Sequence, residues 1–199
     1  MIDVTINRER GIGGSDTYAL MKNDWHNLWL LKTKRKSPPN LSNKLPVQIG
    51  IATEHVNEKF LQTKLKLDWQ PYSEGQLREE HPNFLTAKGG ICYAHYDGYI
   101  PQLDYLVEYK HTGAINFRNG NPKKMPEVVE TYMAQMQHYM YVADKEAIFL
   151  SVIFGNHRHE YELIYRDEEF INRLLDYEKA FWAYVITDTA PSIINKEKN

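Results

Sequence analysis

The sequence predicts an α/β domain in which a central mixed β-sheet is flanked by helices. Apolar residues recur with helical spacing near both ends of the chain and with strand-like patterns between them. The order is helices, strands, helix, hairpin, helix, which suits a sheet covered on both faces. A length of 199 residues fits one domain, and 42% hydrophobic with 25% charged residues is ordinary globular composition. We therefore expect one domain over residues 1–199, with a polar tail from about residue 191.

Five helices are predicted from apolar spacing and from residues that begin helices. Ser15 is expected to be the N-cap of the first helix, because its hydroxyl can accept a backbone N–H there. The third helix carries Ile49, Ala52, Val56 and Phe60 near helical period, which predicts a buried stripe. The predicted ranges are 16–21, 24–34, 48–64, 126–142 and 167–185.

Strands are predicted in the middle of the chain and again after residue 146. The predicted ranges are 69–72, 76–78, 91–96 and 105–110, followed by a hairpin of 147–154 with 159–165 that turns at Gly155-Asn156. Alternation along strand 105–110 places Glu108 and Lys110 on one face. Residues 111–125 form a long loop rich in Gly, Asn and Lys, and loops of that length are often functional.

Composition excludes several classes of protein. No apolar run approaches the length of a membrane span, and the first residues lack the apolar core of a signal peptide. A lone cysteine, Cys92, excludes an internal disulfide framework and a four-cysteine zinc or iron–sulfur site. We therefore expect a soluble, cytoplasmic chain. A net charge of −2 argues against a protein that coats duplex DNA with a broad basic face.

The most informative motif is Asp97, followed after ten residues by Glu108-Tyr109-Lys110. Two carboxylates and a lysine at one sheet edge suit metal-dependent hydrolysis of a phosphodiester. Carboxylate oxygens are ligands for Mg²⁺, and the metal activates water and stabilises charge on the phosphate. The lysine can orient the water or neutralise a developing oxyanion.

The same residues allow other interpretations. Asp97-Gly98 suits the left-handed positions of a hairpin turn. Glu108 and Lys110 also fit a solvated charge pair on one strand face. His157 and His159 would share a strand face, but no third ligand follows at a suitable spacing, which favours an exposed hairpin over a metal site.

Glu54 and Gln135 can complete the site. Glu54 lies beside the apolar stripe of its helix, one turn after Gly50, which lets a ligand or another chain approach closely. Gln135 lies beside the apolar face of its own helix, and either residue also suits a plain surface position. If the carboxylates converge, two like charges about 4 Å apart cost about 4 kcal/mol at an effective dielectric of about 20. Such a cluster needs a divalent cation or a protonated carboxyl group.

The segment before the first helix is a candidate anion site. Ser15 follows Gly13-Gly14 at a helix start, where a hydroxyl and free backbone N–H groups can bind a phosphate. Arg8 and Arg10 precede it. A basic cluster around the end of the second helix is expected to be a solvated loop, and it contains Lys32, Lys34, Arg35 and Lys36.

Five motifs, in the correct order, resemble those of the lambda-exonuclease-type alkaline nucleases. This YqaJ-like viral recombinase family belongs to the PD-(D/E)xK nuclease superfamily, so the resemblance implies a restriction-endonuclease-like core. The motifs are Arg10-Gly11-Ile12-Gly13-Gly14-Ser15-Asp16, Gly50-x3-Glu54, Asp97-Gly98 with Glu108-Tyr109-Lys110, Tyr132-Met133-Ala134-Gln135-Met136-Gln137, and Tyr165-Arg166-Asp167-Glu168.

The resemblance implies a role for each matching residue. Asp97, Glu108 and the backbone carbonyl of Tyr109 would ligate Mg²⁺. Glu54 would support a second metal ion or its waters. Lys110 would position the attacking water, and Gln135 would hold the geometry of the site. The family therefore implies two Mg²⁺ ions, for which Mn²⁺ is expected to substitute.

The resemblance also implies a substrate and partners. Arg8, Ser15 and Arg10 would contact the 5′-phosphate of duplex DNA that is digested 5′ to 3′ from a free end. His95 stands where the lambda-like pattern has a small hydroxyl residue, so the phosphate pocket is expected to differ. Better-known members form a trimeric ring and work with a single-strand annealing protein in phage recombination, which would place a phage-encoded chain in the bacterial cytoplasm. An endonuclease on the same fold and a non-catalytic DNA-end-binding module are the alternatives.

Overall fold

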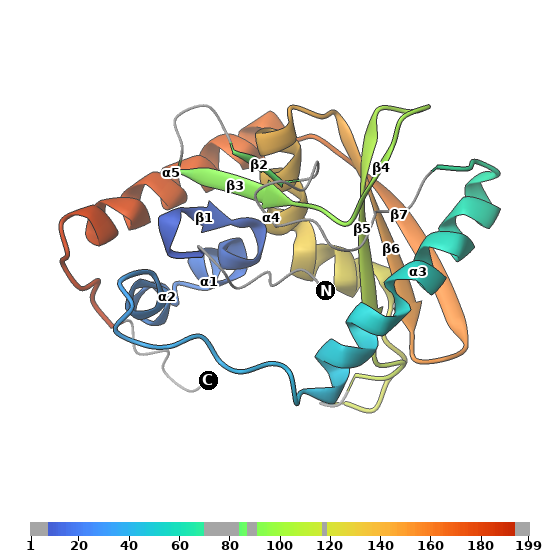
Figure 1. Ribbon diagram of the computed structural model, residues 1–199, viewed down its shortest axis with the longest axis horizontal. Helices are drawn as coiled ribbons and strands as arrows, with labels where there is room; N and C mark the ends of the chain where they lie inside the picture. Colours follow the sequence, from blue (N-terminus) through green and yellow to red (C-terminus); the bar gives the residue numbers. More distant parts are fainter. Residues whose placement is uncertain (1–7, 70–83, 87–90, 117–118, 194–199) are drawn as a thin grey trace.

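The computed structural model describes residues 8–69, 84–86, 91–116 and 119–193 (Figure 1). The elements are η1 (Arg8–Arg10), β1 (Ile12–Gly13), η2 (Gly14–Asp16), α1 (Thr17–Met21), α2 (Trp25–Lys32), α3 (Leu45–Leu65), β2 (Phe84–Thr86), β3 (Cys92–His95), β4 (Gly98–Ile100), β5 (Tyr105–Thr112), α4 (Met125–Ala143), β6 (Ala147–Phe154), β7 (Arg158–Tyr165) and α5 (Glu168–Ile186). No helix in these ranges has the length and apolar character needed to cross a bilayer.

The larger sheet has the order β4-β5-β6-β7 and is mixed, as the sequence predicts. Strands β4 and β7 run antiparallel to their neighbours, whereas β5 and β6 are parallel. The two faces are covered by different helices (Figure 1). On one face Leu61 of α3 packs with Val107 and Phe149, and on the other Met136 and Met140 of α4 belong to the main apolar core.

The smaller sheet has the order β1-β3-β2 and brings the start of the chain beside β3. Strand β1 pairs in parallel with β3, Ile12 opposite Cys92. Around it, α1, α2 and α5 share an apolar core that includes Ile12, Trp29 and Phe181. The N-terminal motif is therefore built into the fold next to the strand that leads to Asp97.

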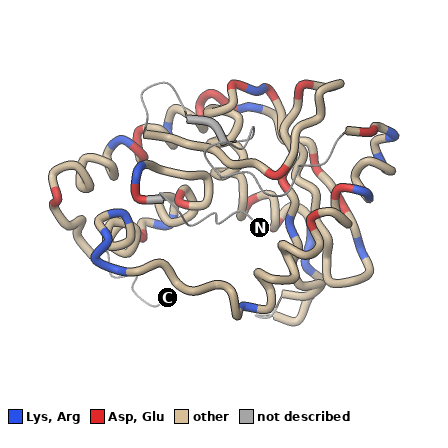
Figure 2. Tube along the Cα trace, in the orientation of Figure 1, with Lys and Arg blue, Asp and Glu red and all other residues tan. Residues whose placement is uncertain are grey.

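A buried ion pair holds this N-terminal region together. Lys32 Nζ lies 2.5 Å from Asp16 Oδ2 and 2.7 Å from the carbonyl oxygen of Gly11. The backbone N–H of Gly13 donates to the same Asp16 oxygen at 2.9 Å. The expectation that Lys32 belongs to a solvated run is thus wrong. The rest of that run, 34–36, is exposed at the start of the connection to α3 (Figure 2).

Three local predictions differ from the structure. Ser15 is not an N-cap, because it lies inside the 3₁₀ turn η2 and α1 begins at Thr17. Trp69 is buried but outside any strand, and the remainder of the expected strands 69–72 and 76–78 lies outside the described residues. Strand β4 was not anticipated, because three residues are too few for an alternation to be visible.

The expected apolar stripe of α3 is not buried. Ile49 and Phe60 are exposed, and Asn57 and Leu61 are the buried residues of this 21-residue helix. The helix therefore contacts the sheet along a face rotated from the stripe that the sequence suggests. The other predicted helices and the hairpin at Gly155 form within two residues of their expected bounds.

Candidate active site

Asp97 and Glu108 are brought together by the pairing of β4 with β5. Asp97 immediately precedes β4, and its backbone N–H donates to the carbonyl oxygen of Val107 at 3.1 Å. Its Oδ2 accepts the backbone N–H of Tyr109 at 2.8 Å. The strands are instead joined by the turn at 101–104, where Asp104 takes the left-handed conformation with φ of 59°. The alternative that Asp97-Gly98 forms the hairpin turn is therefore wrong.

Glu108 points to the α4 face of the sheet and is only 2% exposed, which overturns the solvated-pair interpretation. Its Oε1 pairs with Lys110 Nζ and accepts the amide of Gln135 at 2.9 Å. Its Oε2 is buried and has no hydrogen-bond partner among the described residues. Besides burial, the charge of Asp97 raises the pKa of Glu108, which indicates that the two carboxyl groups lie close together. Such a contact requires either a shared proton or a cation.

The electrostatics of this pair fit a hard divalent cation. Burial and the Asp97 charge raise the pKa of Glu108 to about 8, against the opposing effect of Lys110. Burial likewise raises the pKa of Asp97, although Lys110 and the Tyr109 N–H oppose it. Carboxylates that burial makes costly to ionise are stabilised by Mg²⁺, which binds oxygen ligands. Glu108 Oε2 and Asp97 are therefore the residues that would hold the ion.

Lys110 is poised as a cation beside this pair. Burial lowers its pKa, but Glu108 and Asp97 outweigh burial, and the net shift is upward. Its Nζ lies 4.9 Å from the centre of the Tyr132 ring, and such a contact favours a positive charge. The ammonium group thus stays charged and held between the acidic pair and α4.

Glu54 approaches the site from the other face of the sheet. It is exposed on α3, yet the protein around it and the Asp97 charge raise its pKa to about 8, with Lys110 opposing. It is not part of a tight cluster with the other two acids. Among the described residues, the only group of three His, Cys, Asp or Glu whose ligand atoms all lie within 4.8 Å is elsewhere. Glu54 therefore does not close on Asp97 and Glu108 to that distance.

Gln135 connects the acidic pair to the N-terminal motif. Its Nε2 donates to Glu108 Oε1 and to the hydroxyl of Tyr139, both at 2.9 Å. Gly14 lies against the same two side chains, because a Cβ at Gly14 would be 2.3 Å from a Tyr139 ring carbon and 3.0 Å from Gln135 Cγ. Only glycine permits this approach. Sequence reasoning found Gln135 but missed Tyr139, although its spacing of four from Gln135 puts both on one helix face.

The candidate phosphate-binding residues differ in how far they are exposed. Ser15 follows Gly14 and is exposed, and Arg10 is exposed at the end of η1. His95 is half-buried on β3, two residues before Asp97. The side chain of Arg8 lies outside what the structure describes. The roles of these residues, and of the Tyr109 carbonyl, stay predictions.

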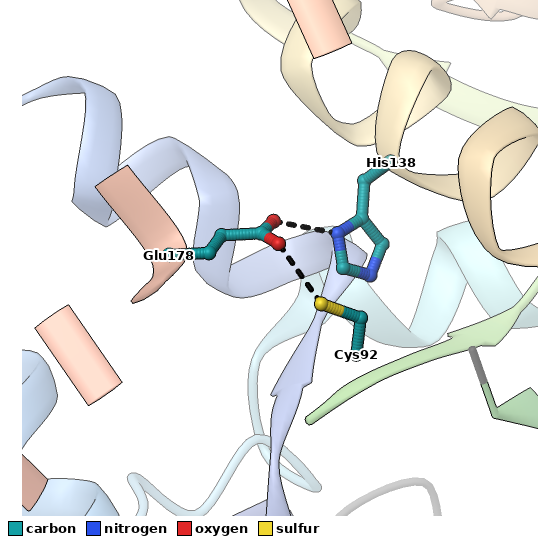
Figure 3. A group of neighbouring side chains, drawn as sticks. All are labelled: Cys92, His138 and Glu178. Atoms are coloured by element: carbon teal, nitrogen blue, oxygen red, sulfur yellow. Dashed lines mark hydrogen bonds and ion pairs between the residues drawn. The ribbon is translucent and has the colours of Figure 1, made fainter. Parts of the chain in front are cut away.

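A second polar cluster is the tight group noted above, formed by Cys92, His138 and Glu178 (Figure 3). Cys92 Sγ donates to Glu178 Oε2 at 3.0 Å, and His138 contacts Glu178 Oε1 through Nδ1 at 2.7 Å and the Tyr93 carbonyl through Nε2 at 2.9 Å. Burial lowers the pKa of His138, but Glu178 and the Tyr93 carbonyl raise it more. Both ring nitrogens therefore donate, and neither has a lone pair for a metal.

This contrast separates the two clusters. Every polar side-chain atom of Cys92, His138 and Glu178 has a partner. Glu108, by contrast, has a buried oxygen with no donor in the described parts of the chain. Buried polar atoms normally have a partner, so this oxygen is available to a proton shared with Asp97 or to a cation. The cluster of Cys92, His138 and Glu178 joins β3, α4 and α5, whereas the site at Glu108 fits a cation.

Known proteins share sequence and fold with this chain. Residues 6–146 match the family model of the YqaJ-like viral recombinase domain, a range that includes Glu54, Asp97, Glu108, Lys110 and Gln135. The chain is 28% identical over 183 residues to the uncharacterized protein YqaJ of Bacillus subtilis (strain 168), covering 89% of this chain and 54% of that protein. The chain thus spans about half the length of the curated relative that it matches.

Solved structures share the fold. An alkaline exonuclease from Laribacter hongkongensis has a TM-score of 0.63 and 15% identity, covering 91% of this chain and 90% of that one. A phage related exonuclease from Haemophilus somnus 129PT has a TM-score of 0.65 and 12% identity, with coverage of 89% and 96%. The expected nuclease-type fold is confirmed, and the matched domain model shows that the chain belongs to the YqaJ-like viral recombinase family.

Proposed function

We propose that the chain is a Mg²⁺-dependent exonuclease that hydrolyses duplex DNA from 5′-phosphorylated ends. The observation that carries the proposal is the buried Glu108 oxygen that has no donor among the described residues and belongs to the carboxyl group linked to Asp97. Exonucleases with the same fold support it, as does membership of a viral recombinase family. Action in phage-type recombination, two metal ions, a ring-shaped homo-oligomer and an annealing partner remain part of the proposal.

Each residue of the site has a separate proposed role. Asp97 and Glu108, with the Tyr109 carbonyl, would hold Mg²⁺, and Glu54 would bind a second ion or its waters. A bound Mg²⁺ supplies Lewis acidity toward the scissile phosphate. Lys110 places a positive charge where negative charge develops in the transition state. Gln135 keeps Glu108 Oε1 occupied, so that Oε2 would remain available to ligate the ion.

End recognition would come from the motif before α1. Ser15 directly follows Gly14, which packs against Gln135, so a 5′-phosphate bound at Ser15 with the help of Arg10 would be near the acidic pair. His95 would shape this pocket in place of a small hydroxyl residue. Its larger ring changes the size of the pocket and adds a group that can donate to phosphate.

The test compares linear duplex DNA carrying a 5′-phosphate, the same duplex with a 5′-hydroxyl, and a closed circle, each with Mg²⁺, with Mn²⁺ and with a chelator. We expect metal-dependent release of nucleotides from the phosphorylated linear duplex, slower digestion of the hydroxyl end, and an intact circle. Cleavage of the circle at a similar rate would instead indicate an endonuclease. Binding of DNA ends without cleavage under any metal would indicate a non-catalytic module.

A further inference from the structure

Asn57 is the buried polar residue of α3, in which Leu61 is the other buried residue. It is 2% exposed, while Leu45, Ile49 and Ile51 in the same helix are exposed. Its amide bonds two strands at once. Nδ2 donates to the carbonyl oxygens of Lys110 at 3.1 Å and Ser151 at 3.0 Å, and Oδ1 accepts the Ser151 hydroxyl at 2.7 Å. One side chain therefore joins α3 to β5 and to β6.

The orientation of this amide follows from its partners. Two carbonyl oxygens require N–H donors, so Nδ2 must face them and Oδ1 must face the Ser151 hydroxyl. Ser151 Oγ also lies 2.9 Å from His159 Nε2. Because the single hydroxyl hydrogen goes to Asn57, His159 must carry its proton on Nε2. Both N–H groups of Asn57 are used, and the amide cannot rotate without leaving a buried polar atom unpaired.

Asn57 lies between Glu54 in the sequence of α3 and Lys110 in the neighbouring strand, and so connects Glu54 to the acidic pair. Glu54 precedes it by three residues, so the two lie on neighbouring parts of one helix surface. Asn57 binds the backbone of Lys110, whose ammonium group pairs with Glu108. The nearest buried apolar anchor of α3 is Leu61, a turn further from Glu54. Thr53 adds one contact, at 3.0 Å from His111 Nδ1. Of the two buried residues of α3, Asn57 is therefore the nearer to Glu54.

We propose that Asn57 is a positioning residue that sets the reach of Glu54 toward the metal site through its hydrogen bonds to Lys110 and Ser151. The inference rests on the proposed function, since Glu54 matters for catalysis only if the site holds metal. The ligand atoms of Glu54, Asp97 and Glu108 do not all lie within 4.8 Å of one another, so the contribution of Glu54 depends on where α3 lies. Groups that orient metal ligands typically change metal affinity by about 10–100-fold when they are removed.

The experiment measures the Mg²⁺ concentration for half-maximal cleavage, together with kcat at saturating Mg²⁺. Asn57→Ala is expected to raise that concentration about 10-fold or more. Ser151→Ala removes one of the three hydrogen bonds and should give a smaller rise in the same direction. Gln62→Ala is the matched control, because Gln62 tethers the same helix to the Trp69 carbonyl at 2.9 Å but lies two turns beyond Glu54. It should leave the Mg²⁺ requirement unchanged.

The double variant Glu54→Gln with Asn57→Ala separates positioning from general destabilisation. If Asn57 acts through Glu54, the double variant needs no more Mg²⁺ than Glu54→Gln alone. Additive effects, or an unchanged Mg²⁺ requirement in a folded Asn57→Ala, would overturn the proposal. If the wild type binds Mn²⁺ by calorimetry but cleaves no DNA, the proposed function fails, and the Mn²⁺ affinity of Asn57→Ala then decides this inference independently.

Discussion

The Gln135 amide donates to Oε1 of Glu108 at 2.9 Å, and Lys110 pairs with that same oxygen. Two donors on one carboxylate oxygen orient the carboxyl group and leave Oε2 without a donor among the described residues. The relationship assigns the two oxygens different tasks. One anchors Glu108 to α4 and β5, and the other is available to a cation.

Replacing Gln135 should therefore weaken metal binding. Gln135→Leu is expected to lower Mn²⁺ affinity by about 10–100-fold, as loss of a group that orients a metal ligand typically does. Calorimetric titration measures this directly. Gln137→Leu is the control on the same helix, because Gln137 bonds Tyr165 and Asp167 and not the acidic pair. It should lose stability while keeping Mn²⁺ affinity, and equal loss of affinity in both variants would contradict the assignment.

Lys110 should be needed for cleavage and not for DNA binding. Lys110→Met keeps much of the side-chain length but removes the charge placed beside Glu108. We expect cleavage to fall by at least about 100-fold, comparable to loss of one transition-state donor, with DNA affinity changed by less than about 10-fold. Single-turnover cleavage and fluorescence anisotropy measure the two quantities. An active Lys110→Met variant would remove this residue from the mechanism.

The stability of the metal-free protein, and the extra stability that Mg²⁺ gives, should change with pH in opposite directions. Glu108 has an ordinary pKa of 4.5 and a folded-state pKa of about 8, so the folded form binds more protons between these values. The metal-free protein should therefore lose stability as pH rises from about 4.5 to about 8. Mg²⁺ requires ionised carboxylates, so the increase in Tm that it causes should be larger at about pH 9 than at about pH 6. Thermal scans at both pH values test this, and Glu108→Gln should flatten the metal-free dependence.

The Asp16–Lys32 pair should be a major stabilising contact of the N-terminal region. Both side chains are buried, and their contact also orders the backbone of Gly11 and Gly13. Asp16→Asn leaves Lys32 as a buried charge without its counterion, so we expect a loss of about 3–5 kcal/mol in unfolding free energy. Urea denaturation measures it. Asp24→Asn, which alters an exposed contact with Asn27, is expected to cost under about 1 kcal/mol.

Gly14 and Gly50 should respond oppositely to alanine. A Cβ at Gly14 would overlap the Tyr139 ring and press on Gln135, so Gly14→Ala should lose about 1–3 kcal/mol of stability and much of the activity. A Cβ at Gly50 would meet no described atom within 4 Å, so Gly50→Ala in α3 should gain about 0.5–1 kcal/mol. If Gly50→Ala is stable but inactive, DNA approaches this glycine closely, as the sequence suggested.

The site residues Glu108, Lys110 and Gln135 could be predicted from the sequence, because each follows from the periodicity of its own strand or helix. Strand alternation puts Glu108 and Lys110 on one face, and helical spacing sets Gln135 beside the apolar face of α4. These periodicities require only backbone geometry. Periodicity does not show which of these residues become buried. Glu108 is buried on the face of the sheet that α4 covers, whereas Glu54 is exposed on α3, and this difference depends on how the helices pack on the sheet.

The sequence by itself determined the mixed α/β class, most helix positions, and which acids, lysine and glutamine to consider. Tertiary structure alone decided that Asp97 precedes a strand, that Lys32 is buried against Asp16, and that Asn57 is the polar anchor of α3. The contacts of Lys32 and Asn57 depend on partners 16 and 53 residues away in the chain, and periodicity carries no information about distant partners. The same reason explains why α3 appeared to bury Ile49 and Phe60: an apolar spacing indicates a face, but only packing shows whether another element covers it.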